Sequence, residues 1–169
     1  MTLRPDDALP SHPSAEPIDY AKTAILEDLF YLGYTLSDKI IVYKTDTTEI
    51  TAKFRTITPL ELRSVFETST KFTSFEAQDI TNKIEVLARA ITHVNDMPLI
   101  LNTKDRDDFF QKFHKEPSPL DQARYVLTEK ISSIHMLNLL YEAYANFADA
   151  IRTEFEDIKK KLKSTPDSK

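Results

Sequence analysis

The chain has 169 residues, of which 41% are hydrophobic and 29% are charged, and its formal net charge is -5. These values fit one compact domain, and the negative charge argues against nucleic acid as the main ligand. The sequence contains no cysteine and a single glycine, Gly33, which excludes disulfides, thiolate zinc sites and glycine-rich phosphate-binding loops. No apolar run approaches the roughly 20 residues that a membrane span needs, so we expect no membrane partner.

The first part of the chain divides into an arm and a helix. Residues 1–17 contain four prolines among small and charged residues, which predicts an extended proline-rich arm. From Ile18 onward the apolar residues recur at helical spacing, and Gly33 follows at the position of a left-handed C-terminal cap. The apolar positions of this first predicted helix are Ala21, Ile25, Leu29 and Leu32.

Residues 39–57 predict a β-hairpin. Two β-branched segments flank the polar turn 45–48, and both segments are rich in the residue types that favour strands. In the second segment Ile50, Ala52 and Phe54 alternate with polar residues, so this face is expected to lie on the helices.

Three helices are predicted after the hairpin. Thr58, Pro59 and Glu61 form a capping-box pattern with proline at the first helical position, which starts one helix. A second helix is predicted to run as far as Val94 and to stop at residues 95–98. Its buried face is the regular series Ile80, Ile84, Leu87, Ile91 and Val94. A third, short helix is expected over 103–114.

The C-terminal region predicts one long helix over 119–163. Ser118 and Pro119 repeat the capping pattern, and no proline or glycine interrupts the chain before the end of this range. A helix of this length outruns a core of this size, so its last part is expected to project, to pair with a second copy or to lie on a partner. Its apolar stripe consists of Leu137, Leu140, Tyr144, Phe147, Ile151, Phe155, Ile158 and Leu162.

The predicted fold class is therefore mainly α: a helical bundle with one small β-hairpin and a long C-terminal helix. A single helical domain is expected over 18–163, preceded by the arm at 1–17 and followed by a disordered tail at 164–169.

No pattern in the sequence predicts catalysis, a metal or a cofactor. The four histidines lack the spacing of three or four residues that places two ligands on one helix face. The carboxylates Asp105, Asp107 and Asp108 lack the glycine and the distal glutamate of a calcium loop, and acidic residues in a first helical turn simply favour the helix dipole. The lysines at 159–163 are likewise typical of a helix C-terminus, although a nucleic-acid-binding or partner-docking tail is the alternative.

Aromatic and aliphatic side chains are the better candidates for function. Large apolar residues on a helix are typical of protein contact surfaces, although packing inside the protein's own bundle is an equal alternative for residues 141–147. The predicted protein-binding residues are Phe66, Phe72, Phe75, Tyr141, Tyr144, Phe147, Ile151, Phe155, Ile158 and Leu162.

Several motifs between residues 39 and 99 also carry a family resemblance. They are a strand pair leading into Phe54-Arg-Thr-Ile-Thr-Pro-Leu-Glu61, a helix ending in Glu85-Val-Leu-Ala-Arg-Ala-Ile91, and the stretch Asn95-Asp-Met-Pro-Leu99. With the later stretch Leu137-Asn-Leu-Leu-Tyr-Glu-Ala-Tyr144, this region resembles the tail assembly chaperones and baseplate-hub assembly proteins of tailed bacteriophages.

The resemblance implies a non-catalytic factor in tail or baseplate morphogenesis. Such a factor binds tape measure, tube or baseplate hub proteins in the host cytoplasm and shields their hydrophobic helices during assembly. Two alternatives stay open: a structural subunit of the hub, neck or tail adaptor that is retained in the virion tail, and a small nucleic-acid-binding regulator. A homo-oligomer formed through the long C-terminal helix is also open.

Overall fold

The structure, a computed structural model, describes residues 35–131 and 133–164. The predicted arm at 1–17, the predicted first helix and residues 165–169 of the predicted tail lie outside the described residues. In chain order the described elements are β1 (Ile40–Lys44), β2 (Glu49–Phe54), α2 (Pro59–Ser69), α3 (Phe75–Ala90), β3 (Ile91–Val94), β4 (Met97–Pro98), α4 (Thr103–Phe113), α5 (Pro119–Tyr125), the π-helical turn η1 (Val126–Lys130) and α6 (Ile134–Ser164).

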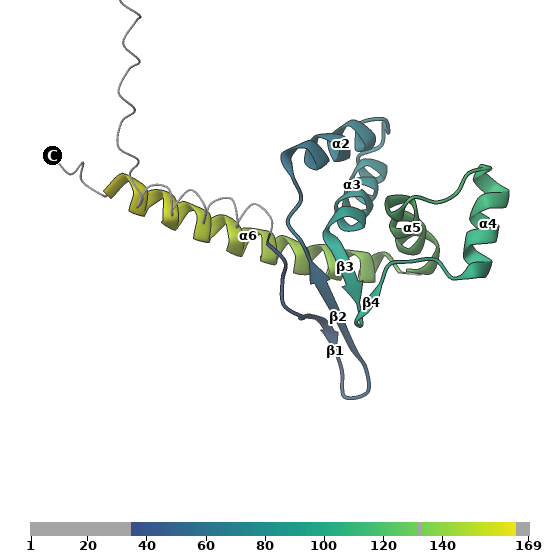
Figure 1. The fold of residues 1–169 in the computed structure, drawn as a ribbon, viewed down its shortest axis with the longest axis horizontal. Helices are drawn as coiled ribbons and strands as arrows, with labels where there is room; N and C mark the ends of the chain where they lie inside the picture. Colours follow the sequence, from purple (N-terminus) through teal and green to yellow (C-terminus); the bar gives the residue numbers. More distant parts are fainter. Residues whose placement is uncertain (1–34, 132, 165–169) are drawn as a thin grey trace, which may run out of the picture.

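The strands form one antiparallel sheet with the order β1-β2-β3-β4. The predicted hairpin at 39–57 is confirmed as β1 and β2, in which Lys44 pairs with Glu49 and Ile40 with Ala52. The prediction of a mainly α bundle with one hairpin was wrong, because two further strands extend the sheet and make the fold mixed α and β. Figure 1 shows α6 crossing the strands, while α2 and α3 lie beyond one end of the sheet, and α3 also contacts α6 directly.

β3 lies where the helix predicted to run as far as Val94 was expected to continue, and β4 lies in the predicted stop at residues 95–98. α3 ends at Ala90, and Ile91 turns to an extended conformation with φ -72° and ψ 126°. Residues 91–94 then pair with β2, a state that their β-branched side chains favour. Asn95 and Asp96, with φ of 49° and 61°, form the two-residue turn that leads into β4. Ile91 and Val94 continue the helical spacing of α3, but the pairing of residues 91–94 with β2 overrides it.

The two predicted helix starts are confirmed. At the start of α2 the Thr58 side chain accepts a hydrogen bond from the Glu61 N–H, and the Glu61 carboxylate accepts one from the Thr58 N–H at 2.8 Å. Ser118 and Asp121 make the same reciprocal pair at the start of α5. Because each box satisfies N–H groups that a helix terminus leaves without partners, the local sequence sets where both helices begin.

The long helix predicted over 119–163 is divided in the structure. α5 passes into the π-helical turn η1, and Ile131 is extended with ψ of 94°. α6 begins at Ile134 and runs for 31 residues, which corresponds to about 46 Å. The division allows α5 and α6 to pack on different sides of α3.

The core lies where the sheet, α3 and the first half of α6 meet. Phe54, Leu87, Leu140 and Val65 are its largest fully buried side chains. The ring of Phe54 lies 5.9 Å from that of Tyr144 and 6.3 Å from that of Phe147, measured between centroids. The face of β2 predicted to meet the helices is buried at Ala52 and Phe54, although Thr51 on the other face is buried too. Figure 1 shows α6 crossing the sheet and continuing past it.

Candidate protein-binding surface

Three exposed phenylalanines lie at or near the connection between α2 and α3. α2 ends at Ser69, and Ser74 caps the start of α3 by accepting a hydrogen bond from the Ala77 N–H. Phe66 lies in the last turns of α2, Phe72 in the connecting loop, and Phe75 at the first position of α3. Their exposed fractions are 57%, 44% and 82%. We call these three residues the tip surface, and Figure 1 shows that this connection points away from the sheet.

The tip surface stands on a firmly packed base. Beside Phe66 on α2, Val65 is fully buried and Ser69 is nearly so. The Gln78 amide donates a hydrogen bond to the Phe72 carbonyl at 2.5 Å, which ties the loop to α3. Exposed aromatic groups on a rigid support lose little conformational entropy on binding, so this geometry suits a contact with another protein.

A bidentate ion pair anchors the start of α2 to the sheet. Both guanidinium Nη atoms of Arg55 donate to the Glu61 carboxylate, at 3.0 and 2.5 Å. These hydrogen bonds, together with the Thr58 N–H, lower the pKa of Glu61 to about 2 against the opposing effect of burial. Glu61 therefore stays ionised at physiological pH and holds α2 on the end of β2.

A second carboxylate connects α3 with its two neighbouring helices. Glu85 accepts hydrogen bonds from Arg124 of α5 at 2.7 and 2.6 Å and from Arg89 one turn along α3. Arg89 also donates to the Ser64 hydroxyl of α2 at 3.1 Å. Burial acts to raise the pKa of Glu85, but the two arginines outweigh it and the pKa is lowered. Asp121, 3.6 Å from Arg124, supplies the second carboxylate that balances the two arginines, so the cluster is structural.

The predicted binding residues on α6 fall into two groups. Tyr144 is only 8% exposed and belongs to the core, and Tyr141 and Phe147 pack against it. Burial raises the pKa of the Tyr144 hydroxyl. Farther along, Phe155 is 39% exposed, and Ile151 and Ile158 are half-buried. The side chain of Leu162 lies outside the described residues.

The structure thus separates the ten predicted residues into three places: the tip surface, the core and the far end of α6. Only the tip surface combines strong exposure with several aromatic rings. Which of the ten contact a partner stays a prediction.

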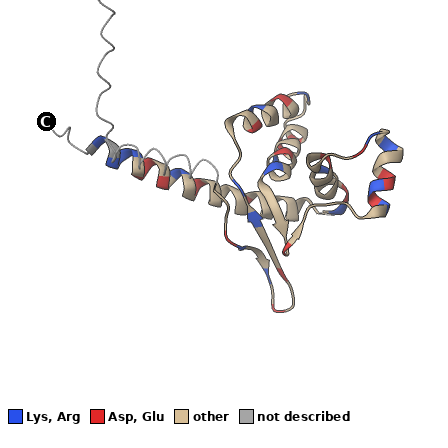
Figure 2. Ribbon diagram, viewed as in Figure 1, with Lys and Arg blue, Asp and Glu red and all other residues tan. Residues whose placement is uncertain are grey.

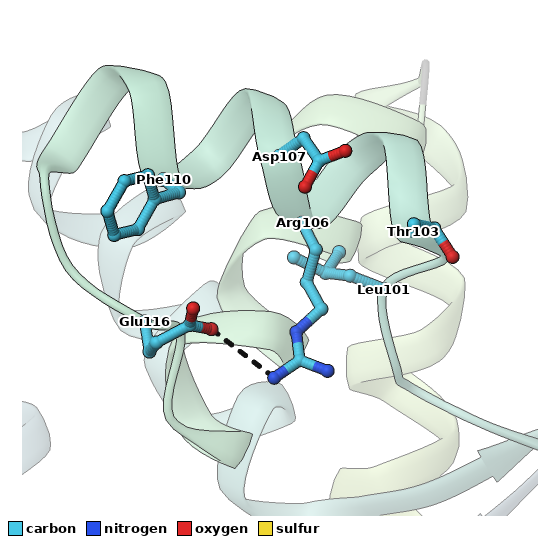
Figure 3. Close-up of a pocket in the computed structure, with 6 residues that line it drawn as sticks. All are labelled: Leu101, Thr103, Arg106, Asp107, Phe110 and Glu116. Carbon is cyan, nitrogen blue, oxygen red and sulfur yellow. Dashed lines mark hydrogen bonds and ion pairs between the residues drawn. The ribbon is translucent and has the colours of Figure 1, made fainter.

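Two surface hollows do not resemble ligand sites. One, of about 500 Å³, lies between α4 and the loop that follows it and is shown in Figure 3. There Arg106 donates to Glu116 at 3.3 Å across the opening, so its charge is offset. Another, of about 630 Å³, lies beside the Arg55–Glu61 pair and Arg89, all of which have partners.

Sequence reasoning missed a third hollow, of about 630 Å³, between β4 and η1. Met97 and Ile100 at its rim are 67% and 65% exposed, and Val126 and Ile131 line it from the other side. The apolar run 97–101 is the sequence feature that indicates this hollow. The sequence analysis used its first residues only as part of the predicted helix stop at 95–98.

The chemistry of the described residues offers little beyond packing. Within residues 35–131 and 133–164, no three histidine or carboxylate side chains gather as a metal site would require. In the same part of the chain, no helix combines the length and apolar character needed to span a lipid bilayer.

Comparisons with known proteins give no relative. No protein family, no curated protein and no solved structure matches the chain.

Proposed function

We propose that this protein is a non-catalytic factor that binds another protein through the tip surface. The observation that supports this is the exposure of Phe66, Phe72 and Phe75, whose exposed fractions are between 44% and 82%. They lie on the helix pair α2 and α3, which is held in place by the ion pairs of Glu61 with Arg55 and of Glu85 with Arg124. Clustered exposed aromatic groups are unusual on a protein without partners and are typical of interface hot spots.

The expected partner presents an apolar helix or loop of its own. Burying three phenylalanine rings removes apolar surface from water, and this gain drives the association without any bond being made or broken. The resemblance of residues 39–99 to phage tail assembly chaperones and baseplate-hub assembly proteins supports tape measure, tube or hub proteins as the partner class. In that setting the protein would shield hydrophobic helices until the tail polymerises.

The test is affinity purification of the tagged protein from cells that express its native neighbours, followed by mass spectrometry. The double variant Phe66→Ser/Phe75→Ser is expected to reduce the recovered partner by at least about tenfold, because truncated hot-spot residues cost 2 kcal/mol or more. A matched control is Phe110→Ser/Phe113→Ser on α4, where the two rings are 49% and 47% exposed. The control is expected to retain the partner.

Each outcome decides part of the proposal. Equal recovery with both double variants would exclude the tip surface as the binding site. A bound fraction without tail, tape measure or hub proteins would remove the phage assignment and leave only a protein-binding domain. Presence of the protein in purified particles would favour a structural subunit over a chaperone that leaves.

A further inference from the structure

The hollow between β4 and η1 has the size and lining of a small-molecule site. Its volume is about 630 Å³, and seven of its eleven lining residues are apolar. Residues 97–100 form one wall, and Val126 and Ile131 line the other side. Sites for small molecules are typically concave, lined mainly by apolar side chains and roughly 300–1,000 Å³ in volume.

The β4 wall of the hollow offers little to an incoming peptide backbone. β4 is the last strand of the sheet, and a free edge usually pairs with an extended segment through its N–H and C=O groups. Pro98 has no N–H, and its carbonyl accepts the Ile100 N–H at 2.9 Å. Met97 pairs with Val94 across the turn. Strand addition at β4 is therefore largely blocked, and recognition at this wall depends on side chains.

The charges around the hollow are matched. Lys130 donates to one oxygen of Asp105 at 2.7 Å, and the Asn102 amide donates to the other at 2.8 Å. α4, which contributes Asp105, carries three acidic and three basic residues, and Figure 2 shows the two signs alternating along it. A charged ligand would lose its hydration here without finding an unpaired counter-charge, so the lining favours an uncharged one.

Two polar side chains in the lining keep hydrogen-bond donors. The Asn95 side-chain oxygen accepts the Thr51 N–H at 2.9 Å, which fixes the orientation of the amide. Its Nδ2 has no hydrogen-bond partner within residues 35–131 and 133–164. Lys130 uses one of its three ammonium N–H groups for Asp105. Because Nδ2 and Nζ can only donate, they select a ligand that carries an acceptor oxygen.

We propose that this hollow binds an uncharged, mainly apolar small molecule that carries a carbonyl-type oxygen. The apolar body lies between residues 97–100 and the side chains of Val126 and Ile131, and the oxygen accepts from Asn95 or Lys130. The wall on the η1 side is a π-helical turn, a rare element that is frequently found at functional sites. This inference is independent of the tip surface and goes beyond the proposed function.

Benzophenone and two charged derivatives test the class of ligand. Benzophenone is apolar and uncharged and has one carbonyl, 4-benzoylbenzoate adds a carboxylate, and 4-(aminomethyl)benzophenone adds an ammonium group. We expect benzophenone to bind the full-length protein at least about tenfold more tightly than either derivative, as measured by isothermal titration calorimetry. Tighter binding of a charged derivative, or no binding of benzophenone, would overturn the proposal.

Three variants test the lining. Met97 and Ile100 are 67% and 65% exposed, so Met97→Ser/Ile100→Ser should fold and should weaken benzophenone binding by about tenfold or more. Asn95→Asp keeps the oxygen that accepts the Thr51 N–H but removes the Nδ2 donor, and should weaken binding about fivefold. The control Phe110→Ser/Phe113→Ser, which also removes two exposed apolar side chains, should bind as the unaltered protein does.

Photolabelling locates the bound molecule, because the excited benzophenone carbonyl inserts into neighbouring C–H bonds. After irradiation, peptide mass spectrometry should find the label within 94–102 or 126–131, and circular dichroism checks that each variant folds. A label on the tip surface, or equal affinity of Met97→Ser/Ile100→Ser and the control, would overturn the proposal. If benzophenone does not bind but Met97→Ser/Ile100→Ser lowers partner recovery in affinity purification, the occupant is a side chain of a partner protein and the proposal is likewise overturned.

Discussion

The two halves of α6 have the same apolar spacing but different neighbours. In the first half Leu137, Leu140 and Tyr144 are buried against α3 and the strands β1 and β2. The second half, residues 151–164, extends away from the sheet (Figure 1), and we call it the projecting half; its Phe155 remains 39% exposed on a helix of unchanged regularity. The spacing of apolar residues therefore predicts a helix and its apolar face, whereas what covers that face depends on elements elsewhere in the chain.

The charges of the two regions differ in the same way. Beneath the first half, α3 is held by the buried cluster of Glu85, Arg89 and Arg124. The projecting half carries exposed pairs within one helix, such as Lys160 with Asp157 at 3.2 Å. Exposed pairs of this kind add little to stability, while a buried carboxylate with two arginines is costly to disrupt. The difference leads to four predictions.

The largest effect is expected from Glu85→Gln. Loss of the carboxylate charge leaves Arg89, which is 7% exposed, without a counter-charge and leaves Arg124 only its pair with Asp121, so we expect the free energy of unfolding to fall by about 3–5 kcal/mol. Urea denaturation measures this change. The control Glu67→Gln breaks only the exposed pair with Arg63 and should change stability by less than about 0.5 kcal/mol. Similar effects for both variants would contradict a structural role for the cluster.

Leu140→Ala should have the next largest effect. Leu140 is 1% exposed at the centre of the first half of α6, so its truncation leaves a cavity and should cost about 2–5 kcal/mol. The measurement is again the midpoint and slope of urea unfolding. A loss below about 1 kcal/mol would mean that the first half of α6 does not form the core described here.

Acid should weaken the attachment of α2. The pKa of Glu61 is lowered from 4.5 to about 2 in the folded protein, so its contribution is complete above pH 4.5 and is lost as the pH falls toward 2. Because the side chain is 29% exposed, we expect roughly 1–2 kcal/mol rather than the full value of the shift. The variant Glu61→Gln should flatten the dependence of stability on pH in this window. An unchanged slope would show that Glu61 does not titrate as the ion pair requires.

Phe155→Ala should have the smallest effect. The ring is partly exposed in the projecting half, and its removal should lower the free energy of unfolding by at most about 1 kcal/mol. The same denaturation experiment on Leu140→Ala gives a second loss in the free energy of unfolding, and the difference between the two losses measures how much more the first half of α6 contributes to stability. Equal losses in the two variants would show that the projecting half is as firmly buried as the first.

Local signals in the sequence were sufficient for the starts of α2 and α5 and for the hairpin of β1 and β2. The capping boxes at Thr58 and Ser118 act within four residues, so no tertiary information is needed to find them. β3 was missed because Ile91 and Val94 continue the helical spacing of α3, and this local signal is overridden by hydrogen bonds to β2, some 40 residues earlier.

The break between α5 and α6 has a weaker signal. No proline or glycine marks it, but Ser133 accepts a hydrogen bond from the His135 N–H at 3.2 Å near the start of α6, as a capping serine does. In the candidate site, aromatic character was visible in the sequence but exposure was not. Tyr144 and Phe75 are both aromatic residues on helices, but Tyr144 packs on Phe54 of the sheet and is buried, whereas Phe75 is exposed.

The turn between β3 and β4 shows what a chain with almost no glycine gains from its side chains. Glycine at residues 95 and 96 would relax both positive φ angles. It would also remove the Asn95 oxygen that accepts the Thr51 N–H and the Asp96 carboxylate that pairs with Lys39 at 2.6 Å and Lys53 at 3.5 Å. The strained backbone of the turn is therefore retained because its two side chains bind residues of β2 and the residue just before β1, and so hold β3 in the sheet.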